Sequence, residues 1–163
     1  MLDILNKFIN KKMVVIILFL VLIIFGLIIF MNANKDINED NQKQAQVCFQ
    51  NNCFKVELAQ TAQDRKNGLM FREKMDLDKG MFFIFENSGN YSFWMKNVLI
   101  SLDIIWIDEN KEVVFIKENA LPCKEETCLS INPNKQAKYV LEVNAEVVKQ
   151  TGLKIGDKLD IKI

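Results

Sequence analysis

The sequence predicts a mainly β protein, with one small domain built as a sandwich or barrel with two short helices, preceded by one transmembrane helix. Three observations lead to this prediction. A long apolar run without charges lies near the N-terminus, several short segments with strand patterns follow it, and only two stretches among them carry helix signals. Closely spaced strands with few helices are typical of small sandwiches and barrels.

The apolar run Met13–Met31 is interrupted among its large side chains only by Gly26. At about 1.5 Å per residue, a helix of this length spans roughly 28 Å, close to the ~30 Å hydrocarbon core of a bilayer. A buried helix of a soluble core would keep a polar stripe. A cleaved signal peptide would have a shorter apolar region and small residues before the cut. We therefore expect an uncleaved membrane anchor.

The charges that flank this run indicate its orientation. Lys7, Lys11 and Lys12 precede it against Asp3 alone, whereas charges of both signs follow it. By the positive-inside rule, residues 1–12 are cytoplasmic and the C-terminal part of the chain is extracytoplasmic, at the cell membrane. Residues 32–46, NANKDINEDNQKQAQ, are polar and without a pattern, which is typical of a flexible tether. The folded domain is then expected over residues 47–163.

All four cysteines lie beyond the apolar run, as two equally spaced pairs. In an oxidising compartment, paired cysteines predict disulfide bonds. In VCFQNNCFKVEL, the Asn51–Asn52 pair suits a hairpin tip that would place the first two cysteines opposite each other. Four cysteines permit three connectivities, and a zinc site with four thiolates is the alternative. We expect two local bonds, Cys48–Cys53 and Cys123–Cys128.

The first elements of the domain are a strand and a short helix. Phe54–Ala59 alternates apolar and charged residues, as a half-exposed strand does. Thr61 and Asp64 have the spacing of a capping box and predict the start of a short helix in TAQDRKNGLMFR. Helical spacing would bring three of its side chains to one face, namely Arg65, Leu69 and Arg72.

The remaining elements are mostly strands. Gly80–Phe85 is apolar on both faces, which indicates a central buried strand. Val98–Ile107 and Glu112–Lys117 are joined by the polar turn 108–111 and predict a hairpin. The last elements expected are a strand at Lys138–Val143, a helix at Ala145–Thr151 that ends at Gly152, and a strand after the Gly156–Asp157 turn.

Composition excludes several classes of function. The chain has 21 basic and 21 acidic residues, so it lacks the excess of positive charge that nucleic-acid binding needs, and no nucleic-acid partner is expected. It has no histidine, which excludes Ser-His-Asp and Cys-His catalysis and sites with histidine ligands. No catalytic residue, cofactor or resident metal is predicted.

The stretch AQTAQDRKNGLMFR…GMFFIF…FWMKNVLISLDIIWIDENKEVV…KYVLEVNA…GLKIGDKL resembles the domain of unknown function 192 family, over about Val56–Leu159. The resemblance implies a compact, mostly β single domain, often exported or membrane-attached in prokaryotes. It implies no activity. Two positions depart from the family pattern, since Val98 and Ser101 stand where the family usually has threonine and proline.

Asp103 is the most informative polar residue, because it lies within the apolar strand LISLDIIWI. Alternation places it on the same face as Ser101, Ile105 and Ile107. A buried carboxylate without a partner is strongly disfavoured, so we expect a partner. The alternatives are a structural role, as an ion pair or a cap on backbone amides, and a ligand-binding charge in a pocket. The partners expected are Arg65 or Arg72, or else Lys96 or the Asn97 amide.

The segment Phe93–Asn97 is the second candidate. Trp94 beside Lys96 and Asn97 could stack a sugar or a flat ligand, or could simply pack at the rim of the core. Arg65 and Arg72 could clamp an anion, or pin the helix to the sheet.

We therefore expect an extracytoplasmic binding module for a small ligand or an envelope protein, in preference to an enzyme. The candidate binding residues are Arg65, Arg72, Trp94, Lys96, Asn97 and Asp103. One alternative is a hydrolase of envelope polysaccharide or peptide that uses the carboxylates of Asp103 and Glu142. A lesser alternative is Cu(I) bound by methionines, which more often fill core gaps; these are Met70, Met75, Met81 and Met95.

Overall fold

The computed structural model describes residues 11–37 and 45–163 of the chain. The chain divides into two compact units, Met1–Lys43 and Gln44–Ile163.

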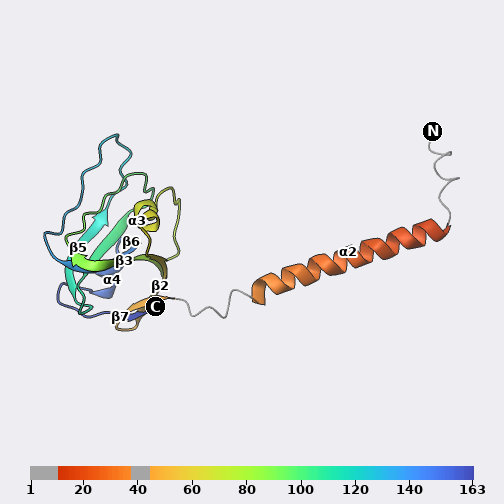
Figure 1. Ribbon diagram of the computed structural model, residues 1–163, viewed down its shortest axis with the longest axis horizontal. Helices are drawn as coiled ribbons and strands as arrows, with labels where there is room; N and C mark the ends of the chain where they lie inside the picture. Colours follow the sequence, from red (N-terminus) through yellow and green to blue (C-terminus); the bar gives the residue numbers. More distant parts are fainter. Residues whose placement is uncertain (1–10, 38–44) are drawn as a thin grey trace. The chain divides into compact units, whose positions relative to one another are not determined.

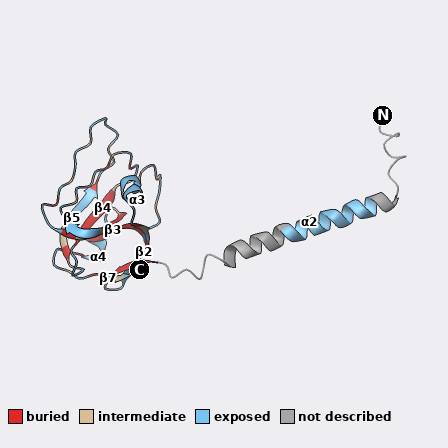
Figure 2. Cartoon of the chain, viewed as in Figure 1, coloured by how far each residue is buried: buried red, intermediate tan, exposed pale blue. Residues whose placement is uncertain are grey.

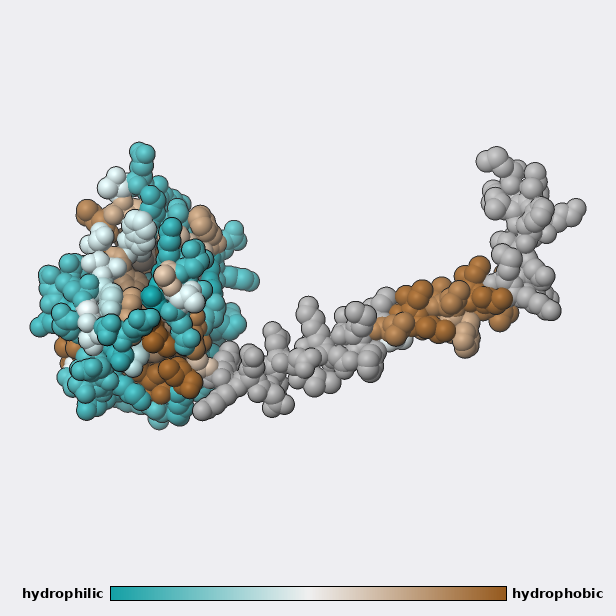
Figure 3. Space-filling model, in the orientation of Figure 1, coloured by the Kyte–Doolittle hydropathy of each residue, from teal (hydrophilic) through white to brown (hydrophobic). Residues whose placement is uncertain are grey.

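The first unit contains helix α2, Lys11–Ile37. Its described side chains, those of residues 14–27, are exposed (Figure 2) and almost all large and apolar (Figure 3). Over the residues that the structure describes, no helix is both long enough and apolar enough to cross a membrane. The transmembrane segment expected at Met13–Met31 thus stays a prediction. Residues 1–10 of the expected cytoplasmic segment and 38–44 of the expected tether lie outside the described residues, and 32–37 are helical.

The second unit is a seven-stranded sheet with two short helices (Figure 1). The strand order is β5-β4-β6-β3-β2-β1-β7, and all neighbours are antiparallel except the parallel pair β2 and β3. The strands are β1 Gln46–Phe49, β2 Asn52–Ala59, β3 Lys79–Gly89, β4 Leu102–Ile107, β5 Val113–Ala120, β6 Ala137–Asn144 and β7 Asp160–Lys162, and the helices are α3 Ala62–Asn67 and α4 Val147–Thr151. The mainly β prediction is confirmed.

The sheet curls so that its two edges meet at one end. Glu112, next to β5, forms a β-bridge with Lys158, next to β7. The Val113 amide donates to the Asp157 carbonyl at 2.8 Å, and the Gly156 amide donates to the Val113 carbonyl at 2.8 Å. The architecture is therefore a half-barrel, closer to the barrel alternative than to a sandwich.

Both faces of the sheet are buried. The inner cluster contains Phe82, Ile105 and Val143, and α4 contributes Val147 and Val148 to it. The cluster on the other face contains Phe83, Leu102, Ile104, Trp106 and Val140, and it is completed by residues of the connecting segments, Leu69, Met95 and Val98. Central strands covered on both sides explain why β4 is buried at every position.

The expected elements are present with shifted ends. The Thr61–Asp64 capping box forms, but α3 ends at Asn67, because Gly68 follows it with a positive φ of 47°. Arg65 and Arg72 therefore do not share a helix face, contrary to expectation. The strand expected at Val98–Ile107 begins only at Leu102, and the first hairpin turns at Gln50–Asn51 instead of Asn51–Asn52.

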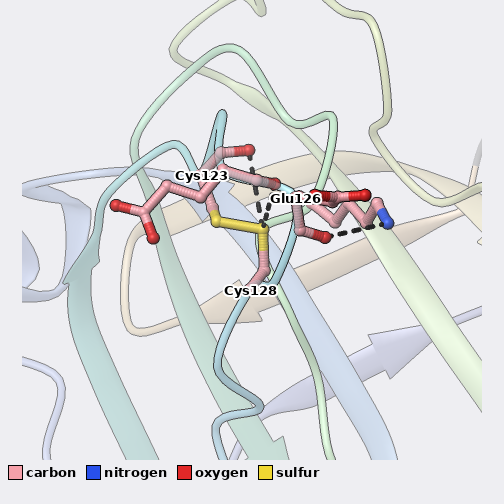
Figure 4. The surroundings of a disulfide bond; sticks show 5 residues. Cys123, Glu126 and Cys128 are labelled. Carbon is pink, nitrogen blue, oxygen red and sulfur yellow. Dashed lines mark hydrogen bonds between the residues drawn. A yellow bond between two sulfur atoms is a disulfide. The ribbon is translucent and has the colours of Figure 1, made fainter.

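The cysteines form the two local bonds expected from their spacing. Cys48 and Cys53 are register partners across β1 and β2, and their sulfur atoms are bonded. Cys123 and Cys128 are bonded within the connection from β5 to β6 (Figure 4). Among the described residues no cysteine is free, so the four-thiolate zinc alternative does not apply to this structure.

Candidate functional site

Two adjoining hollows lie beside α3. The inner cavity has a volume of about 30 Å³ and the outer cleft about 300 Å³. Four residues line both of them, namely Arg65, Lys66, Phe93 and Trp94. The outer cleft is completed by Phe85, Asn90, Tyr91 and Ser92, and the inner cavity by Asn67, Gly68, Leu69, Met70, Phe83, Val98 and Glu142. The outer cleft thus combines aromatic walls with two cationic side chains.

Helix α3 supplies the cations. Its first turn is fixed by the capping box, in which the Asp64 amide donates to the Thr61 hydroxyl at 3.1 Å and the Thr61 amide donates to the Asp64 carboxylate at 3.0 Å. The Arg65 guanidinium donates to the carbonyls of Gln60 and Ile84, the latter at 2.9 Å, and lies 5.1 Å from the centre of the Phe85 ring. Arg65 therefore attaches α3 to the sheet. Lys66 has no hydrogen bond or salt bridge within the described part of the chain, so its charge is available to a ligand.

The aromatic walls hold one another in place. Phe85 and Tyr91 are stacked with ring centres 3.5 Å apart, and Phe93 meets Phe83 edge-on at 4.9 Å. The indole nitrogen of the buried Trp106 donates to the Tyr91 carbonyl at 2.7 Å, which ties the segment before Phe93 to β4. Trp94 is 45% exposed, so a large part of the residue is open to solvent. Because Tyr91 and the Arg65 guanidinium already cover the Phe85 ring, the exposed Trp94 is the wall residue best placed for a ligand ring to stack on.

Glu142, on β6, lies at the floor of the inner cavity. It is only 4% exposed, and in the described residues no hydrogen bond or salt bridge reaches its carboxyl group. No unpartnered side-chain oxygen of the described residues is sealed from solvent, so the Glu142 oxygens keep some solvent contact, and the residue lines the inner cavity. Burial raises the pKa of this carboxyl to about 8. A buried acid without a partner is therefore available at the inner end of the site.

Asp103 has a structural role, and its expected partners were wrong. Its side chain is fully buried on the face of the sheet that α4 covers. There, one oxygen accepts from the Val148 amide and the other from the Asn119 amide, each at 2.8 Å. The first of these bonds caps the N-terminal turn of α4. Of the two alternatives considered for Asp103, the cap on backbone amides is the one present.

The other candidates have separate places. Arg72 forms a two-pronged salt bridge with Glu57 on β2, both contacts at 2.5 Å, and this lowers the pKa of Glu57. Lys96 Nζ lies 5.8 Å from the Trp94 ring centre and 3.4 Å from the Glu126 carbonyl in the disulfide loop (Figure 4). Asn97 accepts from the Phe71 amide through its carbonyl. Of the six candidates, only Arg65 and Trp94 line the inner cavity and the outer cleft.

Asp103 and Glu142 do not form a catalytic pair. Asp103 is opposite Val143 and Ile104 is opposite Glu142 on adjacent strands, so the two carboxyl groups point to opposite faces of the sheet. A hydrolase mechanism that uses both acids has no geometric basis here.

Residues 45–161 match the DUF192 family, described as an uncharacterised ACR. The chain belongs to the DUF192 family. A UPF0127 protein of Thermococcus sibiricus is 29% identical over 109 residues, which are 67% of each chain.

Two solved structures resemble the DUF192 domain. One, from Sinorhizobium meliloti 1021 and described provisionally as a transcription regulator, is 33% identical, with a TM-score of 0.64 and coverage of 72% of this chain and 92% of its own. The other, a Novosphingobium aromaticivorans protein of unknown function, is 34% identical, with a TM-score of 0.63 and coverage of 72% and 83%. The Sinorhizobium meliloti protein is matched over almost its whole length, and in the present chain residues 44–163 form a compact unit of their own.

The methionines of the DUF192 domain lie in or beside its core. Met81 and Met95 are buried in the cluster that contains Phe83 and Trp106, and Met75 packs against it. Met70 lines the inner cavity. Packing accounts for the first three. In the described residues, no three acidic or cysteine side chains gather as metal ligands. Cu(I) binding stays a prediction.

Lys66, Phe85 and Tyr91 line the site although the sequence did not single them out, and Glu142 was expected there only as a hydrolase carboxylate. The sequence contains one signal that Glu142 is buried. In KYVLEV, Val140, Leu141 and Val143 are apolar on both sides of the strand, which is typical of a central strand buried on both faces. An acid within such a strand is then buried as well.

Proposed function

We propose that the DUF192 domain is a membrane-anchored, extracytoplasmic binding module for a small ligand that carries a flat ring and an anionic group. The observation that carries the proposal is the outer cleft, which has room for such a ligand between the aromatic walls and the cations of α3. Ligand sites are usually concave, mostly apolar and equipped with a few placed polar groups. Arg65 and Lys66 supply the charge, and Phe85, Tyr91 and Trp94 supply the rings.

Lys66 and Trp94 provide the test of this site. We expect N-acetyl-L-phenylalanine to bind residues 44–163 more tightly than N-acetyl-L-phenylalaninamide, which has the same ring without the charge. Lys66→Glu should weaken binding of the anion by about tenfold and leave the amide unaffected, while Trp94→Ala should weaken both. Isothermal titration calorimetry measures each affinity.

The matched control is Lys154→Glu, since Lys154 is exposed and lies away from the cleft. It changes the net charge equally and should leave both affinities unchanged. Equal effects of the two lysine variants would mean that charge acts only at long range, and the cleft would not be the binding site.

The anchor and the outward orientation rest on three features. The run Met13–Met31 carries no charge, and the described side chains of α2 are large, apolar and exposed. Lysines predominate on its N-terminal side. Both cysteine pairs of the domain are bonded, as in proteins of oxidising compartments.

A fusion experiment tests the orientation. Alkaline phosphatase is active only outside the cytoplasm, so we expect activity when it is fused after Ile163 and none when it is fused after Lys12. Membranes washed with carbonate should retain the full chain. Activity of the second fusion alone would reverse the proposed orientation, and release by carbonate would contradict the anchor.

A further inference from the structure

We propose that Glu142 binds an ammonium group, and that the ligand of this domain is therefore a zwitterion: an amino acid, or an amino-bearing anion of similar size. The inference rests on the proposed function, because it assumes that the anionic end occupies the outer cleft. It adds an inner recognition point, which selects the amine.

The inner cavity fits a small hydrogen-bond donor. Its volume of about 30 Å³ gives room for a group of the size of a water molecule, and an ammonium group is of that size. Glu142 provides an unpartnered carboxyl at its floor, in a position that is almost completely buried. An unmade hydrogen bond at a buried polar group is unfavourable, so a ligand that supplies the donor removes this penalty.

The chemistry of the walls favours a cation over a neutral donor. Phe83, Phe93 and Trp94 line the same cavity as Glu142, and the faces of aromatic rings attract ammonium groups. A charge-assisted bond to a carboxylate is also stronger than a bond between neutral groups. A metal ion is a poorer match, because in the described residues the site brings together one acid and no second ligand of that type.

The rest of the ligand must be anionic. Arg65 and Lys66 are the charged side chains that share the inner cavity with Glu142, and both also line the outer cleft. The other residues that line the cavity, from β3 and from the segments around residues 68–70 and 93–98, are uncharged. A simple amine would be repelled by the two cations at the mouth, whereas the carboxylate of an amino acid would be attracted.

Binding should release a proton. Burial keeps Glu142 protonated at pH 7 in the free domain, since its pKa is raised to about 8. The arriving ammonium keeps its own proton and favours the ionised carboxyl, so the Glu142 O–H bond breaks and its proton passes to the buffer. Amine recognition is thereby coupled to proton release.

The test uses residues 44–163 and three probes: L-phenylalanine, N-acetyl-L-phenylalanine, which lacks the ammonium group, and L-phenylalaninamide, which lacks the carboxylate. We expect phenylalanine to bind about tenfold or more tightly than either derivative. Calorimetry at pH 7 in phosphate and in Tris, which differ in ionisation enthalpy, should show release of nearly one proton for phenylalanine and none for the acetylated compound.

Glu142→Gln should reduce the affinity for phenylalanine to that for its acetylated derivative, abolish proton release, and leave the acetylated compound unaffected. Glu118→Gln, an exposed acid on β5, is the matched control and should change nothing. The probe comparison on the unaltered domain needs no variant, so the test survives if the Glu142→Gln variant fails to fold.

Each contrary result has a distinct meaning. If the acetylated compound binds as tightly as phenylalanine, the ammonium site is wrong and the proposed function stands. If the amide binds as tightly as phenylalanine, the cations do not read an anion, and both proposals are wrong. A specific site would have a dissociation constant far below about 10 mM. If no probe binds at that concentration, the ammonium site and the proposed function are both wrong.

Discussion

The free energy of unfolding of residues 44–163 should contain a contribution from Glu142 that falls by about 5 kcal/mol as the pH rises from 4.5 to 8. Below pH 4.5 this carboxyl is protonated in both the folded and the unfolded chain. Between 4.5 and 8 the unfolded chain releases the proton while the folded domain retains it, so rising pH favours unfolding. Above pH 8 both forms are ionised and the loss is complete.

Glu142→Gln isolates this effect, because other groups titrate as well. The pKa of Glu57 is lowered by Arg72, so its contribution has the opposite sign and is lost as the pH falls. Urea unfolding followed by tryptophan fluorescence at pH 4.5, 6, 7 and 8.5 measures both proteins. We expect the Glu142→Gln variant to gain stability relative to the parent at each step up to pH 8. A difference that does not change with pH would show that the Glu142 carboxyl ionises normally in the folded domain.

Asp103→Ala should lower the free energy of unfolding by about 3 to 5 kcal/mol, since it leaves the amides of Val148 and Asn119 without acceptors and opens a small cavity. Thermal and urea unfolding of residues 44–163 measure the loss. Amide hydrogen exchange should also show earlier opening of α4, whose first turn depends on this carboxylate.

Asp103→Asn is the informative companion variant. It keeps the shape and one acceptor oxygen but presents an NH₂ group to the second backbone donor, so we expect a smaller loss of about 2 kcal/mol. Glu118→Ala, an exposed change, should have almost no effect. A loss below about 1 kcal/mol for Asp103→Ala would contradict the capping role.

Local patterns in the sequence predicted the strands well, because alternation and turn residues act over a few positions. The capping box at Thr61, the buried central strand at Gly80–Phe85, the stop at Gly152 and the burial of Asp103 all follow from such patterns. Partners were predicted poorly. Asp103 binds amides 16 and 45 positions away, and Arg72 binds Glu57 from a segment that leaves the helix, so neither contact has a local signature.

The candidate site shows the same division. Trp94 and Arg65 were found from their residue types and immediate neighbours. Lys66 was not distinguished from other surface lysines. The stacking of Phe85 on Tyr91 depends on the irregular backbone at the end of β3, for which the sequence has no local signal. The burial of Glu142 has a local signal in its apolar neighbours, but its place in the inner cavity depends on the position of β6 between β3 and β4, which is set by the topology of the whole sheet.

The meeting of the sheet edges has a consequence for self-association. Unpaired strand edges are templates for adding strands from other molecules, and such pairing leads to aggregation. Here β7 has only three residues, and the start of β5 is already bonded to the chain beside β7. The rest of the β5 edge carries the charged Lys117 and Glu118. Strand exchange between crowded neighbours should therefore be suppressed at both edges.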